Sequence, residues 1–152
     1  MGFFAYPRKE VQSRITPPKR SRFRSGFQPI PERFRSLLID ASGNLFASDW
    51  DTGSIFKFTP NGTKNTFATA GSVGTALAAD RAGNLFAADA EKRTSMKFEP
   101  TGSSSVFAAG ITASVLAVDQ AGNLFAGDSE NTIFKFTASG TKSEFGKTPE
   151  PP

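Results

Sequence analysis

Three aspartates at one repeated position are the residues of this chain whose type and spacing could support chemistry. Asp49, Asp89 and Asp128 each end a phrase Gly-Asn-Leu-Phe-Ala-x-Asp, which recurs at steps of 40 and 39 residues. A ring of such carboxylates could bind a cation in an oxygen-rich channel. Each Asp could instead accept backbone N–H bonds in the loop that follows it. An active site is usually asymmetric, with different residues at equivalent positions of the repeats, whereas a structural role requires the same residue in every repeat. Because the three acids are identical, we favour the structural role.

The composition narrows the remaining chemistry. The chain has 152 residues with no His and no Cys, so the commonest general base, thiolate ligands and disulfides are all missing. The repetition argument also assigns a second set of acids to turn formation, namely Asp40, Asp80 and Asp119. We therefore expect no catalytic residue, no cofactor site and no metal site within the repeats.

The repeated phrase belongs to a unit of about 40 residues. Each unit holds four short apolar runs ended by Gly, Asn, Asp or Pro, which predicts four strands and no helix. The first run, such as Leu77–Ala79, is continuously apolar and is expected to be buried on both faces. The third run, such as Ile55–Phe58, alternates, with two aromatic rings on one face and a lysine on the other. Tandem sheets with this period are typical of architectures that are stabilised by stacking one unit on the next.

These repeats resemble the NHL-type β-propeller repeat and, more loosely, the propellers of the gluconolactonase and senescence-marker family. Those blades carry phrases similar to Asp-x-x-Gly-Asn-Leu-Phe-x-Ala-Asp, and the match covers residues 36–147. The resemblance implies an all-β fold of three four-stranded antiparallel blades, at 36–74, 75–113 and 114–147. Propellers close with 4 to 8 blades, so three blades make an incomplete propeller with two uncovered apolar faces. We expect either a fragment of a longer propeller or a homodimer that completes a six-bladed ring.

The resemblance also allows a test for catalysis. Gluconolactonase-like enzymes hold a divalent metal with a Glu, an Asn and an Asp near the axis, whereas the matching stretches here read Ser36-Leu-Leu, Thr75-Ala-Leu and Ser114-Val-Leu. Streptogramin lyases also resemble the repeats and rely on histidine, which this chain lacks. We therefore favour a non-catalytic scaffold, and the alternative is an incomplete or degenerate metal-dependent lactonase-like hydrolase.

The candidate contacts of such a scaffold lie in the loop after the second strand of each unit. This loop differs most between units, and surface loops on a rigid framework often carry binding specificity. We expect it to bind a protein or glycan ligand. The candidate residues are Asp49, Trp50, Asp51, Glu91, Lys92, Arg93, Ser129 and Glu130.

Residues 1–35 form a separate basic, Pro-rich segment. Residues 1–40 carry nine Lys or Arg against three acids, whereas residues 41–152 carry nine against eleven. We expect a disordered tail here and a disordered end at 148–152. A basic arm for nucleic acid is the less favoured alternative, because the charge cluster is short. Neither a signal peptide nor a transmembrane segment is expected, which leaves the compartment open.

Overall fold

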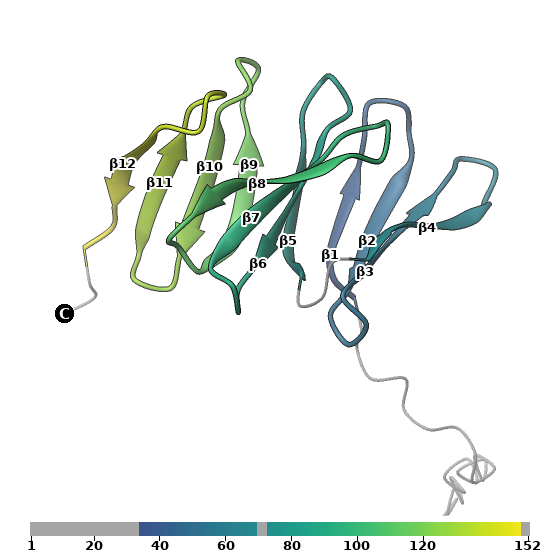
Figure 1. The fold of residues 1–152 in the computed structure, drawn as a ribbon, viewed down its shortest axis with the longest axis horizontal. Coiled ribbons are helices and arrows are strands. Elements are labelled where there is room, and N and C mark those ends of the chain that lie inside the picture. The colour runs from purple at the N-terminus through teal and green to yellow at the C-terminus, as the bar shows by residue number, and fades with distance from the viewer. Residues whose placement is uncertain (1–33, 70–72, 150–152) are drawn as a thin grey trace, which may run out of the picture. The chain divides into compact units, whose positions relative to one another are not determined.

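In the part of the chain that the structure describes, the fold consists of twelve strands in three four-stranded antiparallel sheets (Figure 1). The computed structural model describes residues 34–69 and 73–149, and these contain no helix. Residues 1–33 and 150–152, which hold most of the predicted tail and end, lie outside the described residues. The first sheet contains β1 (Phe34–Ile39), β2 (Leu45–Asp49), β3 (Ser54–Phe58) and β4 (Lys64–Thr69). The second contains β5 (Val73–Ala79), β6 (Leu85–Asp89), β7 (Thr94–Phe98) and β8 (Ser104–Ala109). The third contains β9 (Ala113–Val118), β10 (Leu124–Asp128), β11 (Thr132–Phe136) and β12 (Lys142–Lys147).

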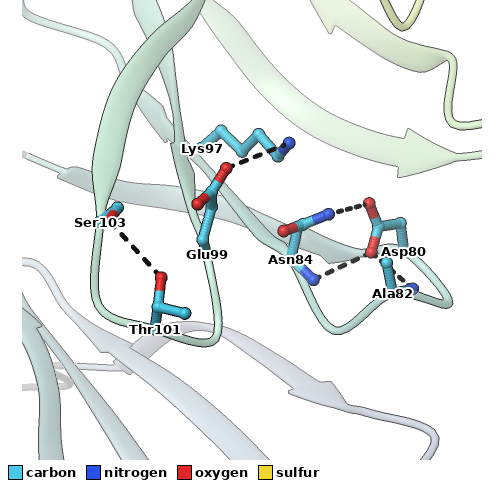
Figure 2. Close-up of polar contacts among 7 residues, drawn as sticks. All are labelled: Asp80, Ala82, Asn84, Lys97, Glu99, Thr101 and Ser103. Carbon is cyan, nitrogen blue, oxygen red and sulfur yellow. Dashed lines mark hydrogen bonds and ion pairs between the residues drawn. The ribbon is translucent and has the colours of Figure 1, made fainter.

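An aspartate closes the hairpin between the first two strands of each sheet. In the second sheet, Asp80 Oδ1 accepts hydrogen bonds from the backbone N–H groups of Ala82 and Asn84, both at 2.9 Å. Asp80 Oδ2 accepts a third bond from Asn84 Nδ2 at 2.6 Å, as Figure 2 shows. Gly83 supplies the left-handed φ of +84° that this turn requires. Asp40 and Asp119 make the equivalent bonds, so the prediction that these acids form turns is confirmed.

The same hydrogen bonds favour the ionised form of two of these carboxylates, those of Asp119 and Asp40. Bonds from the side chain and backbone of Asn123 hold the pKa of Asp119 below its ordinary value. At Asp40, burial raises the pKa, but bonds from Asn44 and Ser42 outweigh this effect and the net pKa is lowered. The turns of Asp40 and Asp119 are therefore best formed when these aspartates are charged.

Each sheet has two different apolar faces. One face carries a pair of Phe rings packed edge to face, and we call it the Phe-pair face. Its ring centroids lie 5.2, 5.1 and 4.9 Å apart in the three sheets. The opposite face carries a Leu of the first strand and the last Phe of the third strand, and we call it the Leu face. The Phe-pair face is defined by Phe46 and Phe67, Phe86 and Phe107, and Phe125 and Phe145. The Leu face is defined by Leu37 and Phe58, Leu77 and Phe98, and Leu116 and Phe136.

The Phe-pair face of one sheet packs on the Leu face of the next. Between the first two sheets, the ring centroids of Phe67 and Phe98 lie 6.2 Å apart. Phe46 and Leu85 belong to one buried cluster there. A second cluster joins Phe86 to the third sheet. The first strands also meet, because β5 lies between β1 and β9. A hydrogen bond from the Leu77 backbone N–H to Ser36 Oγ, 3.0 Å long, links the first two sheets.

Among the sheets of the described residues, the second alone is covered on both faces. On the Leu face of the first sheet, the side chains of Leu37 and Ile39 are 64% and 69% exposed. On the Phe-pair face of the third sheet, Phe145 is 64% exposed. Burial of the first strand on both faces, expected from its apolar run, is therefore found for β5 and is wrong for β1 and β9, where Leu37 and Val115 are exposed. The reason is that no sheet within the described residues lies against these two faces.

Candidate functional site

The loops after the second strands lie at the same edge of the sheets as the beginnings of the first strands. The strand register requires this, because Phe34 pairs with Asp49, Val73 with Asp89, and Ala113 with Asp128. Residues from all three sheets therefore lie together at one end of the strands. We call this side, which is formed by strand ends and loops and is not an edge strand, the variable edge. The repeated Asp turns lie at the opposite edge.

A cavity of about 480 Å³ opens at the variable edge. Its lining includes Trp50, Ala90 and Ser129, which follow the repeated Asp in the first, second and third sheets. Arg35 of β1 stacks on the Trp50 ring, with the guanidinium carbon 5.5 Å from the ring centroid. The indole is about half exposed, and Ser114 adds a hydroxyl. An aromatic surface, a guanidinium group and hydroxyl groups thus share one cavity.

A second cavity, of about 220 Å³, shares Ser129 with the first. Arg93 and Glu130 bring opposite charges to its lining. Arg93 occupies the left-handed region at φ 55°, and its guanidinium donates a hydrogen bond of 3.4 Å to the Gly110 carbonyl. The two cavities together form one depression across the second and third sheets, with the Trp50 ring at one side.

The repeated aspartates of this edge hold the loops. Asp49 is buried, and its carboxylate accepts bonds from the backbone N–H groups of Asp51 and Thr52 at 3.0 and 3.3 Å. Asp89 accepts from the Lys92 N–H at 2.9 Å, and Asp128 accepts from Glu130 and Thr132. These bonds confirm the structural role predicted for the three acids.

The structure brings together four of the eight candidate residues. Trp50, Arg93, Ser129 and Glu130 line one or both cavities, whereas Asp49 is buried beneath its loop. Asp51, Glu91 and Lys92 are exposed and line neither of these two cavities, and the Lys92 ammonium lies 3.5 Å from the Asp89 carboxylate.

Reasoning from loop variability missed the residues that precede the apolar core of the first strands. The linings of the cavities also include Arg35 of β1, Thr112 of the segment before β9, and Ser114 of β9 itself. Their position could have been found from strand direction, because an antiparallel hairpin places the start of its first strand beside the end of its second. The signal available in the sequence was the presence of polar residues at the beginnings of the first strands.

The strand register changes the comparison with metal-binding propellers. Leu37, Leu77 and Leu116 pair with the equivalent residues Ala47, Ala87 and Ala126, so the residues equivalent to Ser36 are Ala76 and Val115. The stretches aligned by sequence from Thr75 and Ser114 were therefore one residue out of register. In the described part of the chain, no group of three or more Asp, Glu, His or Cys side chains is arranged to hold a metal ion.

At the opposite edge, a third cavity of about 180 Å³ includes Asp40, Asp80 and Asp119 in its lining. Their carboxylates accept the turn hydrogen bonds described above. This cavity therefore belongs to the hairpin framework.

Among the described residues no helix is long and apolar enough to cross a membrane.

Comparison with known proteins establishes the architecture. No family model matches the sequence, and no curated protein matches it. Among solved structures, virginiamycin B lyase from Staphylococcus aureus superposes with a TM-score of 0.66 at 17% identity. The nidogen/laminin complex and a gluconolactonase from Xanthomonas campestris, XC5397, also give 0.66, at 18% and 16% identity. The three sheets are β-propeller blades.

The three blades correspond to part of each neighbour. The match covers 82% of this chain and 44% of the lyase chain, 75% and 48% for the nidogen/laminin structure, and 74% and 46% for the gluconolactonase. The chain thus spans less than half the length of these propellers. At such identities the likeness shows the fold alone, and the neighbours include both enzymes and a protein of an intermolecular complex.

Proposed function

We propose that this protein is a non-catalytic β-propeller scaffold that binds a partner protein at its variable edge. The observation that carries the proposal is the convergence of Trp50 and Ser129 from different blades on one cavity, next to the Arg35–Trp50 stack. Of the ligand classes considered above, protein is favoured over glycan for two reasons. Trp and Arg are enriched among residues that dominate protein interfaces, and one structural neighbour is from a protein complex.

The division of roles within each loop supports this proposal. The identical aspartates fix the backbone of the loop, and the residue after each of them differs, being Trp50, Ala90 and Ser129. A constant framework that carries variable side chains is the usual construction of a recognition surface. The ring would be completed by further blades at the two uncovered faces.

The alternative, an incomplete or degenerate metal-dependent lactonase-like hydrolase, has one observation in its favour, the likeness to a gluconolactonase of solved structure. Calcium and zinc titrations with thermal unfolding as the readout separate the two functions. The scaffold predicts an unchanged melting temperature. A metal-induced rise of several degrees would favour the hydrolase, because a ligand that binds the native state raises its stability.

The only Trp of the chain makes the scaffold directly testable. Peptides selected from a displayed library on the full chain should change the fluorescence of Trp50 as they bind. Arg35→Ala should weaken binding at least about tenfold, equal to 1.4 kcal/mol. Arg81→Ala is the matched control, because Arg81 lines the cavity at the opposite edge. Binding that leaves the fluorescence unchanged and tolerates Arg35→Ala would refute this site, and selective binding of glycans on an array would refute the protein partner.

A further inference from the structure

We propose that two copies of this chain join head to tail, so that the Leu face of each first blade covers the Phe-pair face of the other copy's third blade. The product is a closed six-bladed ring with two identical interfaces. This inference adds the partner that covers the ends of the scaffold, and its physical basis is independent of the ligand proposed for the variable edge.

The two uncovered faces are the two halves of an interface that the chain already builds twice. Leu37 on the open Leu face is equivalent to Leu77, which is buried against the first blade. Phe58 on the same face is equivalent to Phe98, which is also buried there. A Phe-pair face placed on Leu37 would therefore meet a Leu and a Phe at the same strand positions as it meets within the chain.

The open Phe-pair face is equally ready for its counterpart. Phe125 and Phe145 already pack edge to face at 4.9 Å, as Phe86 and Phe107 do at 5.1 Å. The Phe86 ring is buried under the third blade, whereas Phe145 is largely exposed. The exposed face thus has the geometry of a covered one before any partner is present, so pairing requires little rearrangement.

A second copy would supply the number of blades that separates this chain from its neighbours. The match covers less than half of each neighbouring propeller, so about one more set of three blades reaches their length. A six-bladed ring falls within the range of closed propellers, which have 4 to 8 blades. Because the two end faces differ, their contact is heterologous, and such contacts form rings when the rotation between units closes. Closure makes two interfaces for a single loss of translational freedom, which favours the dimer over an open chain.

Ring closure would also complete the candidate site. Trp50 belongs to the first blade, whose Leu face is open, and Ser129 belongs to the third blade at the other end. In the ring, the loops of the partner's third blade would lie beside Trp50. Each variable edge would then be lined by loops from both copies.

The test is the solution mass of the full chain, measured by light scattering across micromolar concentrations. The proposal predicts the mass of two chains of 16.2 kDa each. Leu37→Glu and Phe145→Glu should each give a monomer, because each places a charge in both interfaces. Val106→Glu is the matched control, since Val106 is an exposed apolar residue of the middle blade, and it should remain a dimer. Circular dichroism checks that every variant is folded.

Mixing the two monomeric variants tests the head-to-tail arrangement. Their heterodimer has one interface with both substitutions and one wild-type interface, so a 1:1 heterodimer should appear by native mass spectrometry. A monomeric wild-type chain, a dimer of Leu37→Glu, or open polymers would each overturn the proposal. The Arg35→Ala variant should remain a dimer, so loss of partner binding and loss of the ring are separately visible.

Discussion

Replacing Phe86 by Ala should be among the most destabilising single substitutions in this protein. The ring is 2% exposed, packs edge to face on Phe107 at 5.1 Å and lies in the cluster between the second and third blades. Removing a buried Phe costs about 3 to 5 kcal/mol, which combines lost burial with the cavity that remains. About 0.5 to 1.5 kcal/mol of this cost belongs to the aromatic pair itself.

Phe125→Ala is the matched control, because Phe125 occupies the same position in the third blade. Its ring keeps an edge-to-face partner, Phe145, at 4.9 Å, but no blade within the described residues covers the face that carries it. In the monomer this substitution should cost about 1 to 2 kcal/mol, from the aromatic pair and partial burial alone. The difference between the two substitutions measures what stacking between blades contributes.

Urea denaturation followed by circular dichroism gives both free energies of unfolding. Both substitutions should be made in the Leu37→Glu background, so that self-association adds no concentration-dependent stability. Equal losses within about 0.5 kcal/mol would refute the reasoning, because they would mean that the Phe86 ring gains nothing from the third blade.

Three further predictions concern the framework. Ser36→Ala should cost about 1 to 2 kcal/mol in urea denaturation, because the Leu77 N–H loses its acceptor in the neighbouring blade. Gly83→Ala should lower the melting temperature by an amount equivalent to about 1 to 2 kcal/mol, because φ is +84° and the new Cβ would lie 3.3 Å from Pro100 Cγ. The lowered pKa of Asp119 stabilises the fold above the ordinary value of 3.8, and this contribution should disappear as the pH falls through the folded-state pKa. Acid titration of stability should therefore show a shallower slope below pH 3.8 in Asp119→Asn, and an unchanged slope would contradict the assignment.

Local patterns were sufficient to predict the strands and turns of this fold. Each strand carries its own alternation or apolar run, and each hairpin carries its own Asp, Gly and Asn, so both signals lie within a few residues of the element they specify. The alternating Ile55–Phe58 run illustrates this, because the Lys57 ammonium lies over the Phe46 ring on one face and Phe56 occupies the other.

The cavities and the burial of the end blades depend on relations between blades, which no local pattern contains. Loop variability identified Trp50 and Ser129, but Arg35 lies before the repeat and reaches the same cavity only because of strand direction. Likewise, Leu37 and Leu77 occupy the same position in their repeats, and one is exposed while the other is buried. Position in the array, and not residue type, decides that difference.

Amide hydrogen exchange in the monomeric Leu37→Glu variant tests the central claim, that the middle blade is stabilised by a neighbour on each face. The account predicts that β5 and β6 exchange most slowly, near the rate set by global unfolding, and that β1 and β12 exchange faster through opening of the end blades. Equal protection of the three blades would contradict it, because blades that do not depend on their neighbours would open independently.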